Sequence, residues 1–132
     1  MTFNVFANKS PKDIKKITGT WQLVEFKQTK YLPGSRHEIV KKSSNGNTKE
    51  YILDGSSFKS YNNLKKLIQE GNWSIADDKL VEEVNPNSDS PIRGAINAYE
   101  YKLKKNKLIL KYNASTRNDA FITETWKRVK VK

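Results

Sequence analysis

The 132-residue sequence contains no cysteine and a single histidine, His37. The absence of cysteine excludes disulfides, thiolate metal sites and cysteine nucleophiles. A metal centre ordinarily needs several His, Cys or carboxylate ligands, so we expect His37 to be a solvated side chain on a strand. The six glycines are scattered and form no phosphate-binding loop, and no Gly-x-Ser-x-Gly turn positions a nucleophile. We therefore expect no catalytic residues, no metal and no cofactor.

Acidic residues and long apolar runs are also scarce. The chain has 14 Asp and Glu against 25 Lys and Arg, which gives a formal net charge of +11 and a pI near 9.8. No run approaches the roughly 18 apolar residues of a membrane-spanning helix, and the mean hydropathy is −0.81. Aromatic residues make up 11% of the chain, which indicates a packed core. These values predict one basic domain over residues 1–132, with residues 1–13 as an N-terminal arm.

The first residues bear on targeting. Residues 1–7 lack the charged start and apolar stretch of a complete signal peptide. Val5-Phe6-Ala7 resembles the small-residue site at which a leader is removed, while an ordinary N-terminal arm is the other interpretation. We expect a periplasmic or secreted protein if a leader was removed, and a cytoplasmic one otherwise.

Helical signals are few. Ser10-Pro11, followed by Ile14 and Ile17, predicts a short capped helical turn that ends before Gly19. In residues 62–69, Leu64, Leu67 and Ile68 have helical spacing, so this segment is expected to interrupt the series of strands.

Turn-forming pairs separate the strand-like segments. Asn45-Gly46 and Asp54-Gly55 predict hairpins, because both residue types tolerate the positive φ angles of a type I′ turn. Asp77-Asp78 and Lys105-Asn106 also fit tight turns. The segments between them predict strands near residues 20–28, 36–43, 48–53, 56–61, 71–76, 79–84, 95–104, 107–113 and 120–130.

Eight or nine consecutive antiparallel strands predict an all-β fold. Closure into an up-and-down barrel removes the sheet edges that invite aggregation. A β-sandwich is the competing architecture, but it needs crossovers between its sheets, whereas short turns favour pairing between nearest neighbours.

Several short motifs carry a resemblance to a known superfamily. Gly19-Thr20-Trp21 resembles the Gly-x-Trp at the start of the first strand in lipocalins and fatty-acid-binding proteins. The order and spacing of further motifs over about residues 14–130 is similar to bacterial lipocalin-like domains common in Bacteroidetes. These motifs are Asp54-Gly55 with Phe58, Glu70-Gly71-Asn72-Trp73-Ser74-Ile75 with Asp78-Lys79-Leu80, and Thr123-Glu124-Thr125-Trp126-Lys127-Arg128-Val129.

The resemblance implies a structural role for two residues. In that superfamily the first-strand tryptophan closes one end of the barrel and a basic residue on the last strand packs across its ring, which here implies Trp21 and Arg128. The chain departs from fatty-acid carriers at Glu124, where those proteins have an arginine that receives the carboxylate. The lid helices between the first two strands are missing too, because residues 28–36 are few and contain Pro33-Gly34.

Candidate ligand-binding residues are the aromatic residues on strands that would line a small barrel, together with one carboxylate. An eight-stranded barrel leaves an interior that side chains fill or that holds one small ligand, so a packed lumen and a true cavity both remain open. A cavity above about 300 Å³ would favour a carrier. The candidates are Phe58, Trp73, Tyr99, Tyr101, Tyr112 and Glu124.

Lysines are concentrated towards the C-terminal end. A basic hairpin and last strand suit phosphates, an anionic membrane or an acidic protein, but base-specific nucleic-acid recognition is disfavoured. A solvated lysine-rich face that protects edge strands is the favoured interpretation. The residues concerned are Lys102, Lys104, Lys105, Lys107, Lys111, Lys127, Arg128, Lys130 and Lys132.

We therefore expect a monomeric, non-catalytic, lipocalin-like barrel with an apolar or amphipathic ligand in its lumen. The alternative is a protein-interaction module, of the inhibitor or immunity type, that binds an acidic partner through its basic surface.

Overall fold

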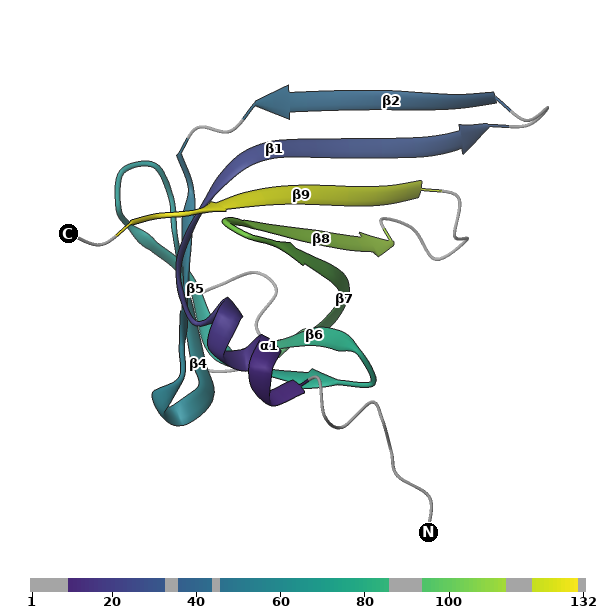
Figure 1. The fold of residues 1–132 in the computed structure, drawn as a ribbon. Coiled ribbons are helices and arrows are strands. Elements are labelled where there is room, and N and C mark those ends of the chain that lie inside the picture. The colour runs from purple at the N-terminus through teal and green to yellow at the C-terminus, as the bar shows by residue number, and fades with distance from the viewer. Residues whose placement is uncertain (1–9, 33–35, 44–45, 86–93, 114–119, 131–132) are drawn as a thin grey trace, which may run out of the picture.

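The computed structural model describes residues 10–32, 36–43, 46–85, 94–113 and 120–130. Strands dominate it, which confirms the all-β prediction, and the short helix lies where the sequence predicts it (Figure 1). The elements are α1 (Ser10–Ile17), β1 (Gly19–Leu32), β2 (Arg36–Ser43), β3 (Thr48–Ile52), the 3₁₀ turn η2 (Asp54–Ser56), β4 (Ser57–Tyr61), β5 (Leu67–Ala76), β6 (Lys79–Val84), β7 (Ile96–Lys104), β8 (Lys107–Asn113) and β9 (Ala120–Arg128).

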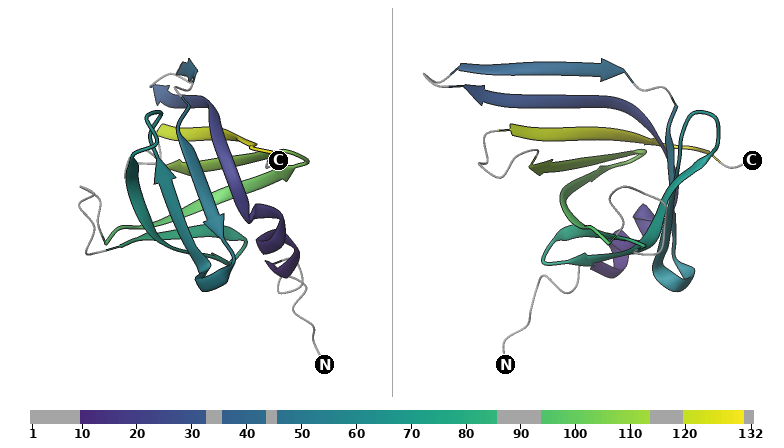
Figure 2. Two further views of the ribbon diagram at one scale, coloured as in Figure 1. Left: turned by 90° about the vertical axis from the view of Figure 1, so that its left-hand side faces the viewer. Right: turned by 180° about the vertical axis from the view of Figure 1, so that it is seen from behind.

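Eight of the strands close into an antiparallel barrel. Strands β3 to β9 pair in chain order, and β1 pairs with β3 on one side and with β9 on the other. Two views at right angles show the ring and the helix beside one end of it (Figure 2). Pairing between neighbours around the whole ring distinguishes this fold from a β-sandwich with crossovers.

Strand β1 changes partner part of the way along its length. Residues 19–22 pair with β3, whereas residues 25–32 pair with β2, and a bulge at Val24 lies between the two segments. A bulge bends its strand, so beyond Val24 β1 moves away from β3 but stays paired with β9, and β2 adds to its other edge outside the ring (Figure 1). The predicted hairpin at Asn45-Gly46 is therefore wrong, because β2 and β3 both pair with β1 and not with each other.

Two further predicted turns, at Asp54-Gly55 and Asp77-Asp78, connect neighbouring strands of the barrel. The Asp54-Gly55 hairpin joins β3 to β4 as predicted, but through the single 3₁₀ turn η2. Asp77 and Asp78 have φ angles of 52° and 62°, which are the two positive values of a type I′ turn, and they join β5 to β6.

The helical spacing in residues 62–69 does not produce a helix. The Asn62 side chain accepts hydrogen bonds from the backbone N–H groups of Leu64 and Lys66, at 2.9 and 3.0 Å, and so forms a tight turn. Leu64 is 81% exposed, and β5 begins at Leu67. The side-chain hydrogen bonds of Asn62 therefore override the apolar spacing.

One end of the barrel is closed by α1, Trp21 and Arg128. Trp21 is fully buried, and its indole N–H donates to the carbonyl of Ile17 at 2.8 Å. The Arg128 guanidinium lies 4.2 Å from the centre of the Trp21 ring and donates to the carbonyls of Thr18 and Lys16. These donors satisfy carbonyls that the end of the helix leaves unpaired.

Gly19 makes this approach of Arg128 possible. A Cβ atom at Gly19 would lie 2.6 Å from Nη1 of Arg128, and the φ angle of 132° is one that other residues rarely adopt. The glycine of the Gly-x-Trp motif thus leaves space for the arginine that covers the tryptophan.

Substitution of Arg128 by lysine should destabilise the protein by about 1–3 kcal/mol. Lysine keeps the charge but lacks the planar fork that stacks on Trp21 and reaches two carbonyls, and each lost hydrogen bond contributes about 0.5–1.5 kcal/mol. Urea unfolding measures the change, with Lys130→Arg at an exposed neighbouring position as the control. Equal stabilities for the Arg128→Lys variant and the original protein would show that the guanidinium group of Arg128 adds nothing to the stability beyond its charge.

Candidate functional site

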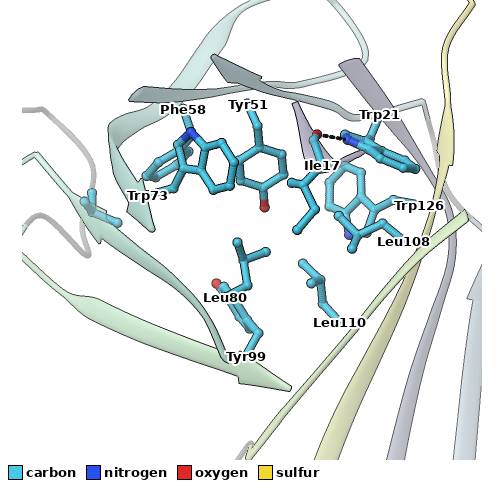
Figure 3. Close-up of a cluster of buried hydrophobic side chains, with 11 residues drawn as sticks. Ile17, Trp21, Tyr51, Phe58, Trp73, Leu80, Tyr99, Leu108, Leu110 and Trp126 are labelled. Atoms are coloured by element: carbon cyan, nitrogen blue, oxygen red, sulfur yellow. Dashed lines mark hydrogen bonds between the residues drawn. The ribbon is translucent and has the colours of Figure 1, made fainter. Parts of the chain in front are cut away.

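The barrel interior changes character along its axis. Near α1 it is a dry cluster in which Tyr51 packs against Trp73 and Phe58, with ring centres 5.0 and 6.5 Å apart (Figure 3). Towards the other end, inward positions hold charged and polar side chains instead. The polar half is where a ligand could find hydrogen-bonding partners, and it is the candidate site.

A buried ion pair lies where the two halves meet. On β3 the alternation of side chains turns both Lys49 and Tyr51 inward, and on β6 it turns Glu82 inward between apolar neighbours. Lys49 Nζ lies 3.0 Å from Glu82 Oε2, and the two residues are only 6% and 1% exposed. The Tyr51 hydroxyl donates to the same carboxylate oxygen, while Tyr99 donates to Glu82 Oε1 at 3.4 Å. The ion pair is thus neutral as a unit and its carboxylate is satisfied on both oxygens.

This cluster raises the pKa values of its tyrosines. Burial raises the pKa of Tyr51 well above its usual value, and the negative charge of Glu82 raises it further. The pKa of Tyr99 is raised by the same two causes in the same order. Both hydroxyls therefore remain hydrogen-bond donors at any physiological pH.

A second carboxylate, Glu124 on β9, lies in the polar half. Its Oε2 accepts a hydrogen bond from the Tyr112 hydroxyl and its Oε1 accepts one from the indole N–H of Trp126, both at 3.0 Å. Burial, followed by the charge of Glu124, raises the pKa of Tyr112. In contrast to Glu82, the hydrogen-bond partners of Glu124 are both neutral.

A half-enclosed cavity of about 270 Å³ occupies this half of the barrel. It does not reach the roughly 300 Å³ that would favour a carrier, so the space suits a small guest rather than a long acyl chain. Its wall combines apolar and polar side chains from Leu23, Asn47, Thr48, Lys49, Ser60, Tyr61, Ile68, Gln69, Asn97, Tyr99, Tyr112, Glu124 and Trp126.

One residue in the cavity wall, Ser60, has a buried hydroxyl group with no hydrogen-bond partner among the described residues. Ser60 is on β4 and is 5% exposed. It lies opposite Lys49 in the β3–β4 pairing, in the wall of the cavity. Since buried polar groups are generally hydrogen-bonded, this hydroxyl is available to a molecule in the cavity.

The structure divides the six candidate ligand-binding residues into two sets. Tyr99, Tyr112 and Glu124 line the cavity. Phe58 and Trp73 belong to the dry cluster, where the Trp73 indole donates to the Ile52 carbonyl at 3.0 Å. The remaining one, Tyr101, donates to Asp13 at the α1 end of the barrel. These three pack the barrel rather than lining the cavity.

The most buried polar residues of the lumen were not among the candidates. Glu82 and Glu83 are adjacent on a strand and point to opposite faces, which allows an inward carboxylate, but outward placement beside lysines is the general expectation for strand carboxylates. Lys49 alternates with Tyr51 on β3, which is a signal for a shared inward face, but lysine is rarely buried and so gave no reason to place it there. Ser60 carried no signal beyond its alternation with Phe58.

Outside the lumen, the predicted basic residues lie largely on one outer face. The side chains on the outer surface of β7, β8 and β9 are exposed, namely Lys102, Lys104, Lys107, Lys111 and Lys127. His37 lies on β2, opposite Tyr31 in the β1–β2 pairing. In the described part of the chain, no three His, Cys, Asp or Glu residues are grouped as a metal site would require. None of the described helices is long and apolar enough to span a membrane.

Fold and site together define a closed, eight-stranded antiparallel β-barrel with a polar half-lumen and one end sealed by a helix. The chain belongs to the family described as a domain of unknown function, DUF4488, whose model matches residues 16–132. Neither a curated protein nor a solved structure matches the chain.

Proposed function

We propose that this protein is a non-catalytic, lipocalin-like binding protein that holds a small amphipathic molecule in the polar half of its barrel. The Ser60 hydroxyl in the wall of the cavity carries the proposal, because a bound guest would supply the hydrogen bond that no described residue gives it. The mixed wall supports an amphipathic guest, since Leu23 and Ile68 offer apolar surface beside charged and hydroxyl groups.

The lumen contains charged residues, but their arrangement favours binding over catalysis. Lys49 and Glu82 neutralise each other, and the two tyrosines that contact Glu82 remain protonated. Ser60 has no base within hydrogen-bonding distance among the described residues, so its hydroxyl is not activated as a nucleophile.

Native mass spectrometry of the protein purified from its own organism or a close host tests this proposal. We expect an adduct under gentle conditions that is lost on denaturation. A Ser60→Leu variant should lose the adduct, because the larger side chain projects into the cavity and the hydroxyl is removed. The matched control is Ser74→Leu, which changes an exposed serine on β5. An adduct that survives in Ser60→Leu would place the ligand elsewhere, and bare protein throughout would contradict a tightly held guest.

The exposed lysines favour a second candidate function, the binding of an acidic protein. Lys107 pairs in register with both Lys104 and Lys127, so like charges adjoin on the outer face of β7 to β9. This repulsion would be relieved by an acidic surface, and such binding would weaken with added salt. The same mass spectra decide between the two candidates, because a retained protein that dissociates at high salt would support the second.

A further inference from the structure

The formal charges in the lumen do not balance. In the part of the chain that the structure describes, the charged inward side chains of the polar half are Lys49, Glu82 and Glu124. Lys49 is 3.0 Å from Glu82, so that pair is neutral. Among the described residues, the donors to Glu124 are the neutral groups of Tyr112 and Trp126. The cavity therefore carries one excess negative charge, although the protein as a whole is strongly basic.

Aromatic rings surround this excess charge. Tyr99 and Tyr112 meet edge to face with ring centres 5.1 Å apart, and Trp126 lines the same cavity. The ammonium group of Lys49 lies 4.9 Å from the centre of the Trp126 ring and 5.7 Å from that of Tyr99. Faces of aromatic rings attract cations. The walls thus already hold one ammonium group and are suited to a second beside Glu124.

An anionic guest would meet the opposite situation. Glu124 would repel it, and the nearest cation, Lys49, is already bound to Glu82. Taking Lys49 from Glu82 would leave a carboxylate that is 1% exposed without its cation, and a buried charge that loses its partner is strongly destabilising.

We infer that the lumen selects a small organic amine, bound as its ammonium form, over a carboxylate of the same size. This inference rests on the proposed function and specifies the ligand class. The ammonium group would pair with Glu124, the body would lie against the aromatic walls, and the Ser60 hydroxyl would complete the hydrogen bonding. The cavity of about 270 Å³ lies below the usual size of ligand pockets, which favours a guest of one ring or a short chain.

Isothermal titration calorimetry with three probes of matched shape tests the inference. Phenethylamine, phenethyl alcohol and phenylacetate share the ring and differ in charge. We expect phenethylamine to bind at least about tenfold more tightly than the alcohol, and phenylacetate to bind most weakly. Equal binding of all three, or preferred binding of phenylacetate, would overturn the choice of an amine while leaving a ligand-binding lumen intact.

A pair of variants locates the selectivity. Glu124→Gln keeps the shape of the side chain and an acceptor for Tyr112, and it should weaken phenethylamine binding about tenfold while changing the affinity for the alcohol less than about twofold. The control Glu100→Gln removes an exposed carboxylate from the outer face of β7 and should change neither. Unchanged amine binding in Glu124→Gln would overturn the inference, provided that thermal unfolding shows the variant to be folded.

Binding of none of the probes at millimolar concentration would also overturn the amine inference. The proposed function fails on a separate observation, which is the absence of any adduct in the native mass spectra of the protein from its own host.

Discussion

Replacement of Lys49 by methionine is expected to lower the free energy of unfolding by about 3–5 kcal/mol, which is the usual cost of removing one partner from a buried ion pair. Methionine has a similar length and fills the same space, so the loss is mainly electrostatic. It leaves the Glu82 carboxylate almost fully buried, and its remaining partners among the described residues are two tyrosine hydroxyls. Urea unfolding followed by circular dichroism measures the change.

The double variant Lys49→Met, Glu82→Gln separates this electrostatic cost from lost packing. Removing both charges should restore much of the stability, because position 82 then no longer holds a buried charge without its partner. The control is Lys79→Met on β6, an exposed lysine whose loss should cost less than about 1 kcal/mol. A similarly small cost for Lys49→Met would show that water screens the pair and that the lumen is wetter than the structure indicates.

The second large effect is expected at alkaline pH. Tyr51 and Tyr99 have pKa values raised by burial and by Glu82, whereas in the unfolded chain a tyrosine ionises near pH 10. Below about pH 10 both residues are protonated in both states, and their contribution to stability is complete. As the pH rises further, the unfolded chain releases these protons while the folded chain retains them. The free energy of unfolding should then fall by up to about 1.4 kcal/mol per pH unit for each tyrosine.

Tyrosinate absorbance measured beside circular dichroism checks this expectation. We expect two phases, of which the second coincides with loss of the β-sheet signal because Tyr51 and Tyr99 ionise only as the barrel opens. Tyr101 and Tyr112 also have raised pKa values and join this phase, so Tyr51→Phe should reduce its amplitude by about a quarter. A single smooth titration near pH 10, with the sheet signal intact, would contradict the assigned burial of these hydroxyls.

The sequence is a better guide to the strands of this protein than to their pairing. Alternation and turn residues place the strand positions well because both are local properties. The change of partner along β1 is not a local property. It depends on the bulge at Val24 and on the pairing of one edge of β1 with both β2 and β3. An Asn-Gly pair thus signalled a turn without determining that its flanking strands would pair.

For the site too, the sequence predicts which side chains point inward but not which of them meet across the barrel. Alternation favours inward positions for Tyr99, Tyr112 and Glu124, and the structure places all three at the cavity. It cannot show that Lys49 on β3 would meet Glu82 on β6, because those strands lie on different parts of the ring and the pair spans 33 residues of sequence. Burial of a lysine is tolerated only with its partner, so neither residue is predictable without the other.

The Lys49–Glu82 pair also bears on how the chain assembles correctly. A slip of β3 by one residue would turn Glu50 inward in place of Lys49 and Tyr51, because neighbouring residues on a strand face opposite sides. The interior would then hold Glu50, Glu82 and Glu124 with no lysine among them, and three carboxylates in a poorly solvated space repel one another. The correct alignment of β3 is thus the one in which the charges of the lumen come closest to balance, so a single buried lysine discriminates against a misaligned barrel.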